Sequence, residues 1–137
     1  MKLCDTSVLV DIDRGGIDET VRRLDEQGRH AISMVSVTEL RLGVNLGYDE
    51  DSEAHREAVD GLDRLLARFE IKSVSRAVAV AAADIIATLK SRGEPLDDLH
   101  DVYVAATART EQVPVLTANV DHFDRIEGVD VDDWTAF

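Results

Sequence analysis

The chain has 137 residues, with 28 Asp and Glu against 15 Lys and Arg, and a formal net charge of −13. This length predicts one domain that buries roughly two thirds of its unfolded surface, and a hydrophobic content of 45% excludes global disorder. No apolar run reaches the roughly 18 residues of a membrane span, and the single cysteine, Cys4, excludes an internal disulfide framework.

The predicted elements begin with a strand at residues 3–4 that ends at Asp5. Because the chain enters this strand without a basic and apolar leader, the sequence predicts a cytoplasmic protein. A short helix to about Asp13 and an amphipathic helix over residues 18–27 follow, separated by two glycines. Residues 31–35 are the next predicted strand.

The middle of the chain is mainly helical in pattern. A helix over residues 36–47 begins at a serine and ends at a glycine, and a charged amphipathic helix covers residues 49–66. Alternation over residues 69–74 predicts the third strand. Residues 76–92 are almost continuously apolar, so we expect a helix that is mostly buried.

The last third returns to alternating elements. A turn at Glu94-Pro95 leads to a helix that carries Asp101, and residues 113–117 are the fourth predicted strand. A polar loop or helical turn anchored by Phe123 follows, and residues 129–131 form a fifth strand at the edge. Strands that alternate with helices predict an α/β domain with a mainly parallel sheet.

Three acids that are distant in the sequence each stand beside an apolar element: Asp5, Glu39 and Asp101. Open α/β sheets place ligand sites at the carboxyl edge of the strands, so we expect these acids to converge there. Carboxylates suit Mg²⁺ or Mn²⁺, and two such ions activate water and stabilise the leaving oxygen in phosphodiester cleavage. The sequence therefore predicts metal-dependent hydrolysis.

Each acid also has a structural alternative. Residues 36–39, with the sequence SVTE, match a capping box whose last carboxylate reaches back to the first amide of the helix. Asp5 is placed to cap the helix that begins near residue 7. Asp101 suits a first helical turn, where the helix dipole favours an acid, although Asp97 or Asp98 fits the capping role better.

Other reaction classes lack their motifs. The four histidines and one cysteine show no zinc-type spacing, and neither a GxxxxGKS phosphate loop nor a GxSxG nucleophile motif is present. A receiver-type signalling domain requires paired acids after the first strand and a lysine after the last. A haloacid-dehalogenase-type phosphatase requires a second acid at position 7, where this chain has Ser7.

The segments CDTSVLVD, SVTELRLG, HDVYVAATAR and VLTANVDHF, followed by VDDW, together resemble a PIN domain. Within that superfamily the chain is most similar to the VapC-type toxin ribonucleases of toxin–antitoxin pairs. The resemblance covers nearly the whole chain in the right order, although residues 48–92 match only in helical character. It implies one three-layer α/β/α domain over residues 1–137, with a mainly parallel sheet of four to five strands.

The resemblance also implies roles for individual residues. Asp5, Glu39 and Asp101 match the metal-binding acids of the family, with Mg²⁺ or Mn²⁺ as the cofactor. A fourth catalytic group comes from the segment around residues 117–122, where Asn119, Asp121 and His122 are the candidates and Asp121 is the acid among them. The residues expected to support the site or bind substrate are polar, namely Thr6, Ser7, Thr117 and Asn119. The family further implies a homodimer, an antitoxin that fills the active-site groove, and an RNA substrate.

The acidic composition needs an explanation in a protein expected to bind RNA, because nucleic-acid binders usually carry a basic patch. The chain has only three lysines. An acidic, lysine-poor surface indicates adaptation to a salty cytoplasm, where the Debye length falls to about 3 Å at 1 M and repulsion from RNA is screened. The alternative is a protein that binds a basic partner. The competing function is a PIN-fold module that binds RNA or protein without catalysis.

Overall fold

The computed structural model describes residues 1–94 and 98–137. Within them, five parallel strands form one sheet in the order β3-β2-β1-β4-β5. The strands are β1 Leu3–Cys4, β2 Ala31–Ser33, β3 Glu70–Lys72, β4 Val115–Thr117 and β5 Val131–Asp133. The predicted mainly parallel α/β sheet is therefore confirmed.

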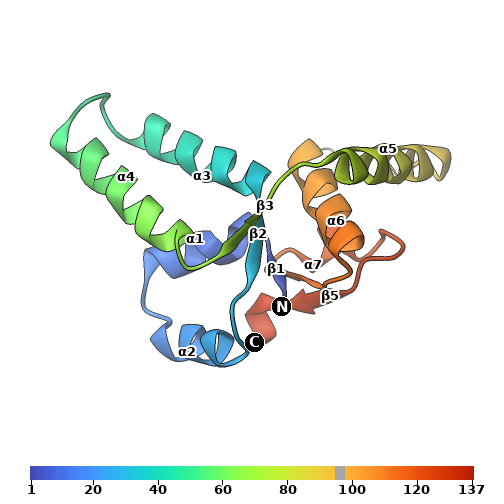
Figure 1. Ribbon diagram of the computed structural model, residues 1–137, viewed down its shortest axis with the longest axis horizontal. Helices are drawn as coiled ribbons and strands as arrows, with labels where there is room; N and C mark the ends of the chain where they lie inside the picture. The colour runs from blue at the N-terminus through green and yellow to red at the C-terminus, as the bar shows by residue number, and fades with distance from the viewer. Residues whose placement is uncertain (95–97) are drawn as a thin grey trace.

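Seven α-helices and one short 3₁₀ helix accompany the sheet in the described part of the chain. The helices are α1 Thr6–Arg14, α2 Asp18–Glu26, α3 Met34–Gly47, α4 Glu53–Leu66, α5 Arg76–Ser91, α6 Leu99–Glu111, α7 Val120–Phe123 and the 3₁₀ helix η1 Trp134–Ala136. Figure 1 shows the sheet between α1, α2 and α4 on one side and α5 and α6 on the other. This is the expected three-layer α/β/α arrangement.

The short central strands send alternate side chains into two hydrophobic clusters, as the pleat of a strand requires. Leu3 and Val115 belong to the cluster under α5 and α6, whereas Cys4 and Leu116 belong to the cluster under α1, α2 and α4. All four side chains are fully buried. Phe123 is also fully buried, which confirms its predicted role as the anchor of the α7 turn.

The start of α3 differs from the prediction. β2 ends at Ser33, and the next residue already begins the helix, so that Ser33 is the N-cap and its hydroxyl accepts from the Val35 amide at 3.2 Å. The predicted capping box at residues 36–39 is therefore wrong, and Glu39 lies in the second turn of the helix. The apolar pair Met34-Val35 continues the strand pattern, which concealed the early helix start.

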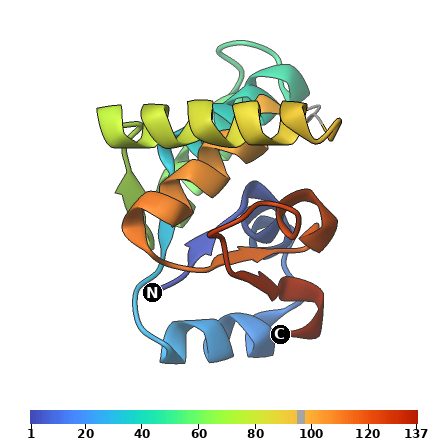
Figure 2. The same cartoon turned by 90° about the vertical axis from the view of Figure 1, so that its right-hand side faces the viewer.

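Two other helices also differ from expectation. α4 begins at Glu53, with Ser52 as the N-cap, rather than at residue 49. α5 buries only one stripe of its apolar surface, and the predicted mostly buried helix is wrong. The buried residues of this stripe are Val78, Ala82, Ile85 and Leu89. Figure 2 shows the reason for this partial burial: α5 lies across the outside of α6, so one face of α5 points away from α6.

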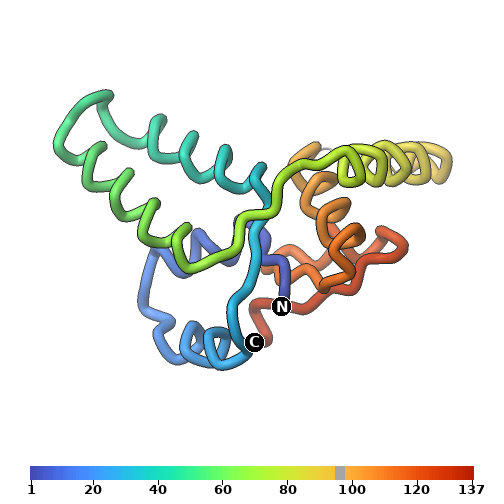
Figure 3. Tube along the Cα trace, in the orientation of Figure 1, coloured from blue at the N-terminus to red at the C-terminus, as the bar shows by residue number. Residues whose placement is uncertain are grey.

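The two-helix arm of α3 and α4 projects from one side of the sheet, as the trace in Figure 3 shows. No helix within residues 1–94 and 98–137 is long and apolar enough to cross a membrane. Pro95 and Asp97, and with them the predicted turn and one candidate helix cap, lie outside the described residues. The other candidate, Asp98, does cap α6, because its Oδ1 accepts from the His100 amide at 2.9 Å.

Candidate active site

The strand order reverses between β1 and β4, since the chain first adds β2 and β3 on one side and later β4 and β5 on the other. Parallel α/β sheets bind ligands at such a point, outside the carboxyl ends of the strands. A cavity of about 340 Å³ lies there. Most of the residues that line it are polar, and the lining consists of Asp5, Thr6, Ser7, Val10, Asp11, Glu39, Asp98, Asp101, Ala118, Asn119 and His122.

Asp5 follows β1 directly and is only 5% exposed. Its backbone occupies the N-cap position of α1, but its side chain makes no capping hydrogen bond. Instead, Oδ2 accepts from the Ser7 hydroxyl at 2.9 Å and from the Thr117 hydroxyl at 3.0 Å. The capping alternative for Asp5 is therefore wrong, and two hydroxyls fix the orientation of this buried carboxylate.

The same two hydroxyls are themselves held by the backbone after β4. Ser7 Oγ accepts from the Ala118 amide at 3.1 Å, and Thr117 Oγ1 accepts from the Asn119 amide at 2.9 Å. The segment after β4 and the start of α1 therefore form one hydrogen-bonded unit around Asp5. This network gives Ser7 and Thr117 supporting positions at the site.

Glu39 reaches the cavity from the second turn of α3. Its Oε1 accepts from the Thr6 hydroxyl at 2.9 Å, and its Oε2 lies 3.4 Å from His100 Nδ1. Since neither oxygen caps the helix, the carboxylate is available to the cavity that it lines. Thr6 therefore orients Glu39 as Ser7 and Thr117 orient Asp5.

Asp101 lies in the first turn of α6 and is 8% exposed. Burial raises the pKa of this carboxyl to about 6, and the negative charges of Asp5 and Asp98 act in the same direction. His122 opposes them, because its Nδ1 lies 2.8 Å from Asp101 Oδ2. A buried acid that is costly to ionise next to other acids is typical of a cation-binding or catalytic site.

Two further residues at the site were not predicted for it. Asp98, the cap of α6, and His100 join Glu39, so that each of the three offers a ligand atom within 4.8 Å of the others. The sequence signal was their spacing of one and three residues before Asp101. A first helical turn brings such residues to the same end of the helix, but the sequence alone did not show that α3 would face them.

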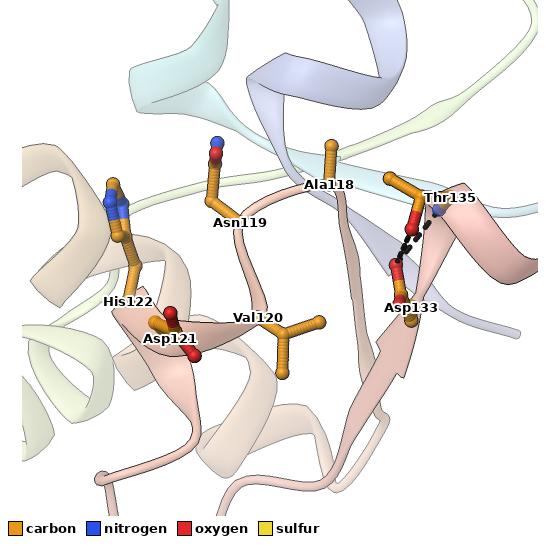
Figure 4. A pocket seen from close by; sticks show the side chains of 7 residues that line it. All are labelled: Ala118, Asn119, Val120, Asp121, His122, Asp133 and Thr135. Carbon is orange, nitrogen blue, oxygen red and sulfur yellow. Dashed lines mark hydrogen bonds between the residues drawn. The ribbon is translucent and has the colours of Figure 1, made fainter.

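The candidates for the fourth group separate in space. Asn119 and His122 line both the cavity that holds the acids and a neighbouring cavity of about 270 Å³, whereas Asp121 lines the neighbouring cavity alone. Asp133 and Thr135 lie on the far side of this second cavity and are hydrogen-bonded to each other, as Figure 4 shows. In the same view, Asn119 and His122 point to the same side of the α7 turn.

The donor set fits a divalent metal ion. Five carboxylates line the cavity, those of Asp5, Asp11, Glu39, Asp98 and Asp101, and no lysine or arginine is among its described lining residues. The group of donor atoms that lie within 4.8 Å of one another contains Glu39 and Asp98 but not Asp5 or Asp101. The hydrogen bonds and ion pairs that the structure describes for Asp5 and Asp101 use Oδ2 in both cases. Hard oxygen donors in excess of any nearby positive charge are what Mg²⁺ and Mn²⁺ prefer.

Comparisons with known proteins agree with this geometry. The PIN domain family matches residues 2–129. Ribonuclease VapC1 from Methanocaldococcus jannaschii is 34% identical over 125 residues, which are 91% of this chain and 80% of that protein. The tRNA(fMet)-specific endonuclease VapC from Shigella flexneri is 27% identical over 109 residues, which are 80% of this chain and 78% of that protein.

A solved structure extends the comparison to three dimensions. DNA-bound VapBC from Salmonella typhimurium contains a chain that matches this fold with a TM-score of 0.83 at 25% identity. The match covers 98% of this chain and 99% of that chain. The resemblance seen in the sequence motifs is confirmed. The chain therefore belongs to the PIN domain family, and its relatives within that family are the VapC ribonucleases.

Proposed function

We propose that this protein is an endoribonuclease that cuts RNA phosphodiester bonds with Mg²⁺ or Mn²⁺, and that it is the toxin of a toxin–antitoxin pair. The observation that carries the proposal is the convergence of Asp5, Glu39 and Asp101, from three separate elements, on a cavity whose described lining has no lysine or arginine. Relatives named as ribonucleases support the same chemistry. We further propose that residues 1–137 act as one nuclease domain.

The carboxylates of Asp5, Glu39 and Asp101 are the proposed metal ligands. A divalent ion held there supplies the Lewis acidity that activates water and stabilises the leaving oxygen of the phosphodiester. Ser7 and Thr117 hold Asp5, Thr6 holds Glu39, and His122 holds Asp101. Hydrogen bonds of this kind fix ligand orientation before the substrate arrives.

For the fourth position we favour Asn119 or His122 over Asp121. Asn119 and His122 line the same cavity as the acids, whereas Asp121 lines the neighbouring one. The amide of Asn119 and the imidazole of His122 are both able to donate a hydrogen bond to an RNA phosphate or sugar oxygen. Asp121 is then placed to contact substrate that extends into the neighbouring cavity.

The proposal extends to partners. The name of the Shigella flexneri relative suggests a tRNA or another RNA as substrate, and the VapBC structure suggests an antitoxin as partner. That the antitoxin fills the active-site groove is what the resemblance to the family implies. We also propose a homodimer, because the outer face of α5 is apolar except for Asp84: Val80 is 55% exposed, and Ala79, Ala83 and Ala87 are exposed. The proposed compartment is the cytoplasm, where RNA and an antitoxin would both be found.

The proposed setting is a cytoplasm of high ionic strength. A net charge of −13 repels RNA strongly at low salt, whereas molar salt reduces the range of that repulsion to about 3 Å. A close approach of RNA to the cavity then depends on the metal ion and on local hydrogen bonds. This is how we reconcile an acidic surface with an anionic substrate.

The test is an assay of the purified full chain with total tRNA in about 2 M KCl, with Mg²⁺, Mn²⁺ or EDTA. We expect discrete cleavage products with either ion and none with EDTA, and re-addition of metal should restore cleavage. RNA binding without cleavage under all metal conditions would instead support the alternative of a catalytically inactive binding module.

A further inference from the structure

His100 lies beside two carboxylates that line the cavity, that of Glu39 on α3 and that of Asp98, the N-cap of α6. Its Nδ1 lies 3.4 Å from Glu39 Oε2 and 4.0 Å from Asp98 Oδ1. The neighbouring histidine, His122, contacts Asp101 instead. His122 lines the cavity, whereas His100 contacts two of the residues that line it. Of the two imidazoles, only that of His100 belongs to the group of three side chains whose donor atoms lie within 4.8 Å of one another.

These separations suit three ligands of one metal ion. Donors about 2.1 Å from an octahedral ion lie about 3.0 Å apart when adjacent and about 4.2 Å apart when opposite. The distances from His100 Nδ1 to Glu39 and to Asp98 fall within that range. The third distance, between Glu39 and Asp98, is within 4.8 Å, and Asp98 and His100 are both partly open to solvent.

A second observation points to a cation in the same cavity. Asp5 and Asp101 line it too, and both are more than nine-tenths buried. Each uses only Oδ2 in the bonds that the structure describes, so Oδ1 of each is without a described donor. Two buried carboxylates beside this mixed oxygen and nitrogen cluster favour a cation, since His122 is the one side chain in the described lining of the cavity that is able to carry a positive charge.

We propose that His100 Nδ1 is a metal ligand, together with Glu39 and Asp98, and that this nitrogen makes the centre select Mn²⁺ over Mg²⁺. Mg²⁺ is bound by oxygen donors and sheds its water reluctantly. Transition-metal ions accept imidazole more readily, and their affinity for nitrogen donors increases along the series from Mn²⁺ to Cu²⁺. The proposal rests on the proposed function only for the location of the catalytic cation, and it concerns binding rather than cleavage.

Pulsed electron paramagnetic resonance of the full-length, RNA-free protein loaded with Mn²⁺ tests the ligand directly. A nitrogen bound to Mn²⁺ modulates the electron spin echo, and we expect this modulation in the wild type, in His122→Gln and in His55→Gln. His55 is a matched control because it lies on α4 outside the cavity, where it pairs with Asn45. In His100→Gln the nitrogen modulation should disappear.

Calorimetry in 1 M KCl then measures selectivity, with no RNA present. His100→Gln should weaken Mn²⁺ binding by about tenfold or more, with little change for Mg²⁺, so the preference for Mn²⁺ falls. Asp98→Asn keeps a good N-cap residue for α6, so its expected loss of Mn²⁺ affinity reports on the ligand and not on the helix.

Three results would overturn the proposal: no nitrogen modulation in the wild type, modulation that persists in His100→Gln, or an equal loss of Mg²⁺ and Mn²⁺ affinity in that variant. Failure of the proposed function is a separate result, because a protein that binds Mn²⁺ through His100 and cuts no RNA supports the ligand assignment alone. Conversely, if the protein cleaves RNA but its Mn²⁺ has no nitrogen ligand, the proposed nuclease function stands and His100 is not a ligand of the metal centre.

Discussion

Replacing Asp101 by Asn should stabilise the metal-free protein at neutral and alkaline pH. Burial, followed by the charges of Asp5 and Asp98, raises the pKa of this carboxyl from 3.8 to about 6. A shift of that size means that ionised Asp101 costs the native state about 3 kcal/mol relative to the unfolded chain. Asn keeps the shape of the side chain and removes the charge, so up to that amount is recovered, less what the lost contact with His122 contributed.

The pH dependence has a definite sign. Between the unfolded and folded pKa values of Asp101 the native state binds more protons than the unfolded state, so wild-type stability falls as pH rises through this interval. Below pH 3.8 the carboxyl is protonated in both states and costs nothing, and above pH 6 the full cost applies. The advantage of Asp101→Asn should therefore grow by about 1.4 kcal/mol between pH 5 and pH 8.

Chemical denaturation in EDTA and 1 M KCl, at pH 5 and pH 8, measures this difference. In a thermal melt of a chain of this size, a difference of 1 kcal/mol in the free energy of unfolding corresponds to about 3 to 4 °C in melting temperature. The matched control is Asp63→Asn, which removes the same charge from an exposed position on α4, and it should change stability little at either pH. A less stable Asp101→Asn, with a deficit equal at both pH values, would refute the reasoning and make Asp101 a structural residue.

Three further predictions follow from the charge, the outer helix and the hydroxyl network. The melting temperature of the wild type should rise steeply between roughly 0.1 M and 2 M KCl, because salt screens the repulsion among 13 net negative charges; a flat profile would contradict high-salt adaptation. Light scattering in molar KCl should give the wild type about twice the chain mass of 15.1 kDa. Val80→Glu on the outer face of α5 should give the mass of the monomer. A monomeric wild type would count against the α5 interface. Thr117→Val should lower the free energy of unfolding by about 1 to 3 kcal/mol and slow cleavage, because the buried hydroxyl both donates to Asp5 and accepts from the Asn119 amide. Unchanged stability and an unchanged cleavage rate would show that Thr117 does not support Asp5.

The sequence was sufficient for the layers of the fold and for the acids at its centre. Alternation of short apolar runs with amphipathic helices predicts βαβ units, and the carboxyl edge of the sheet follows from them. Asp5 directly follows a strand, so its place at that edge needs no knowledge of the rest of the chain. Asp101 is likewise fixed by its position in the first turn of a helix that packs on the sheet.

What the sequence did not predict depends on contacts between distant elements. Glu39 was assigned a competing capping role because β2 runs into α3 at Met34 without a loop, and no local pattern marks that junction. The pairing of His100 with Glu39 and of His122 with Asp101 depends on how α3, α6 and α7 meet. The exposure of α5 depends on where it crosses α6, since an apolar helix is equally suited to a core and to an interface between subunits.

One comparison of cleavage rates tests the proposed catalytic centre most directly. Single-turnover cleavage of total tRNA in about 2 M KCl with Mn²⁺ should be readily measured for the wild type and for Asp63→Asn. Asp5→Asn and Asp101→Asn should each lose cleavage by at least about a hundredfold, as expected when a metal ligand is removed from a hydrolytic centre, while both remain folded and melt no lower than the wild type in EDTA. Cleavage by folded Asp101→Asn at the wild-type rate would contradict the claim that these buried carboxylates form the catalytic centre.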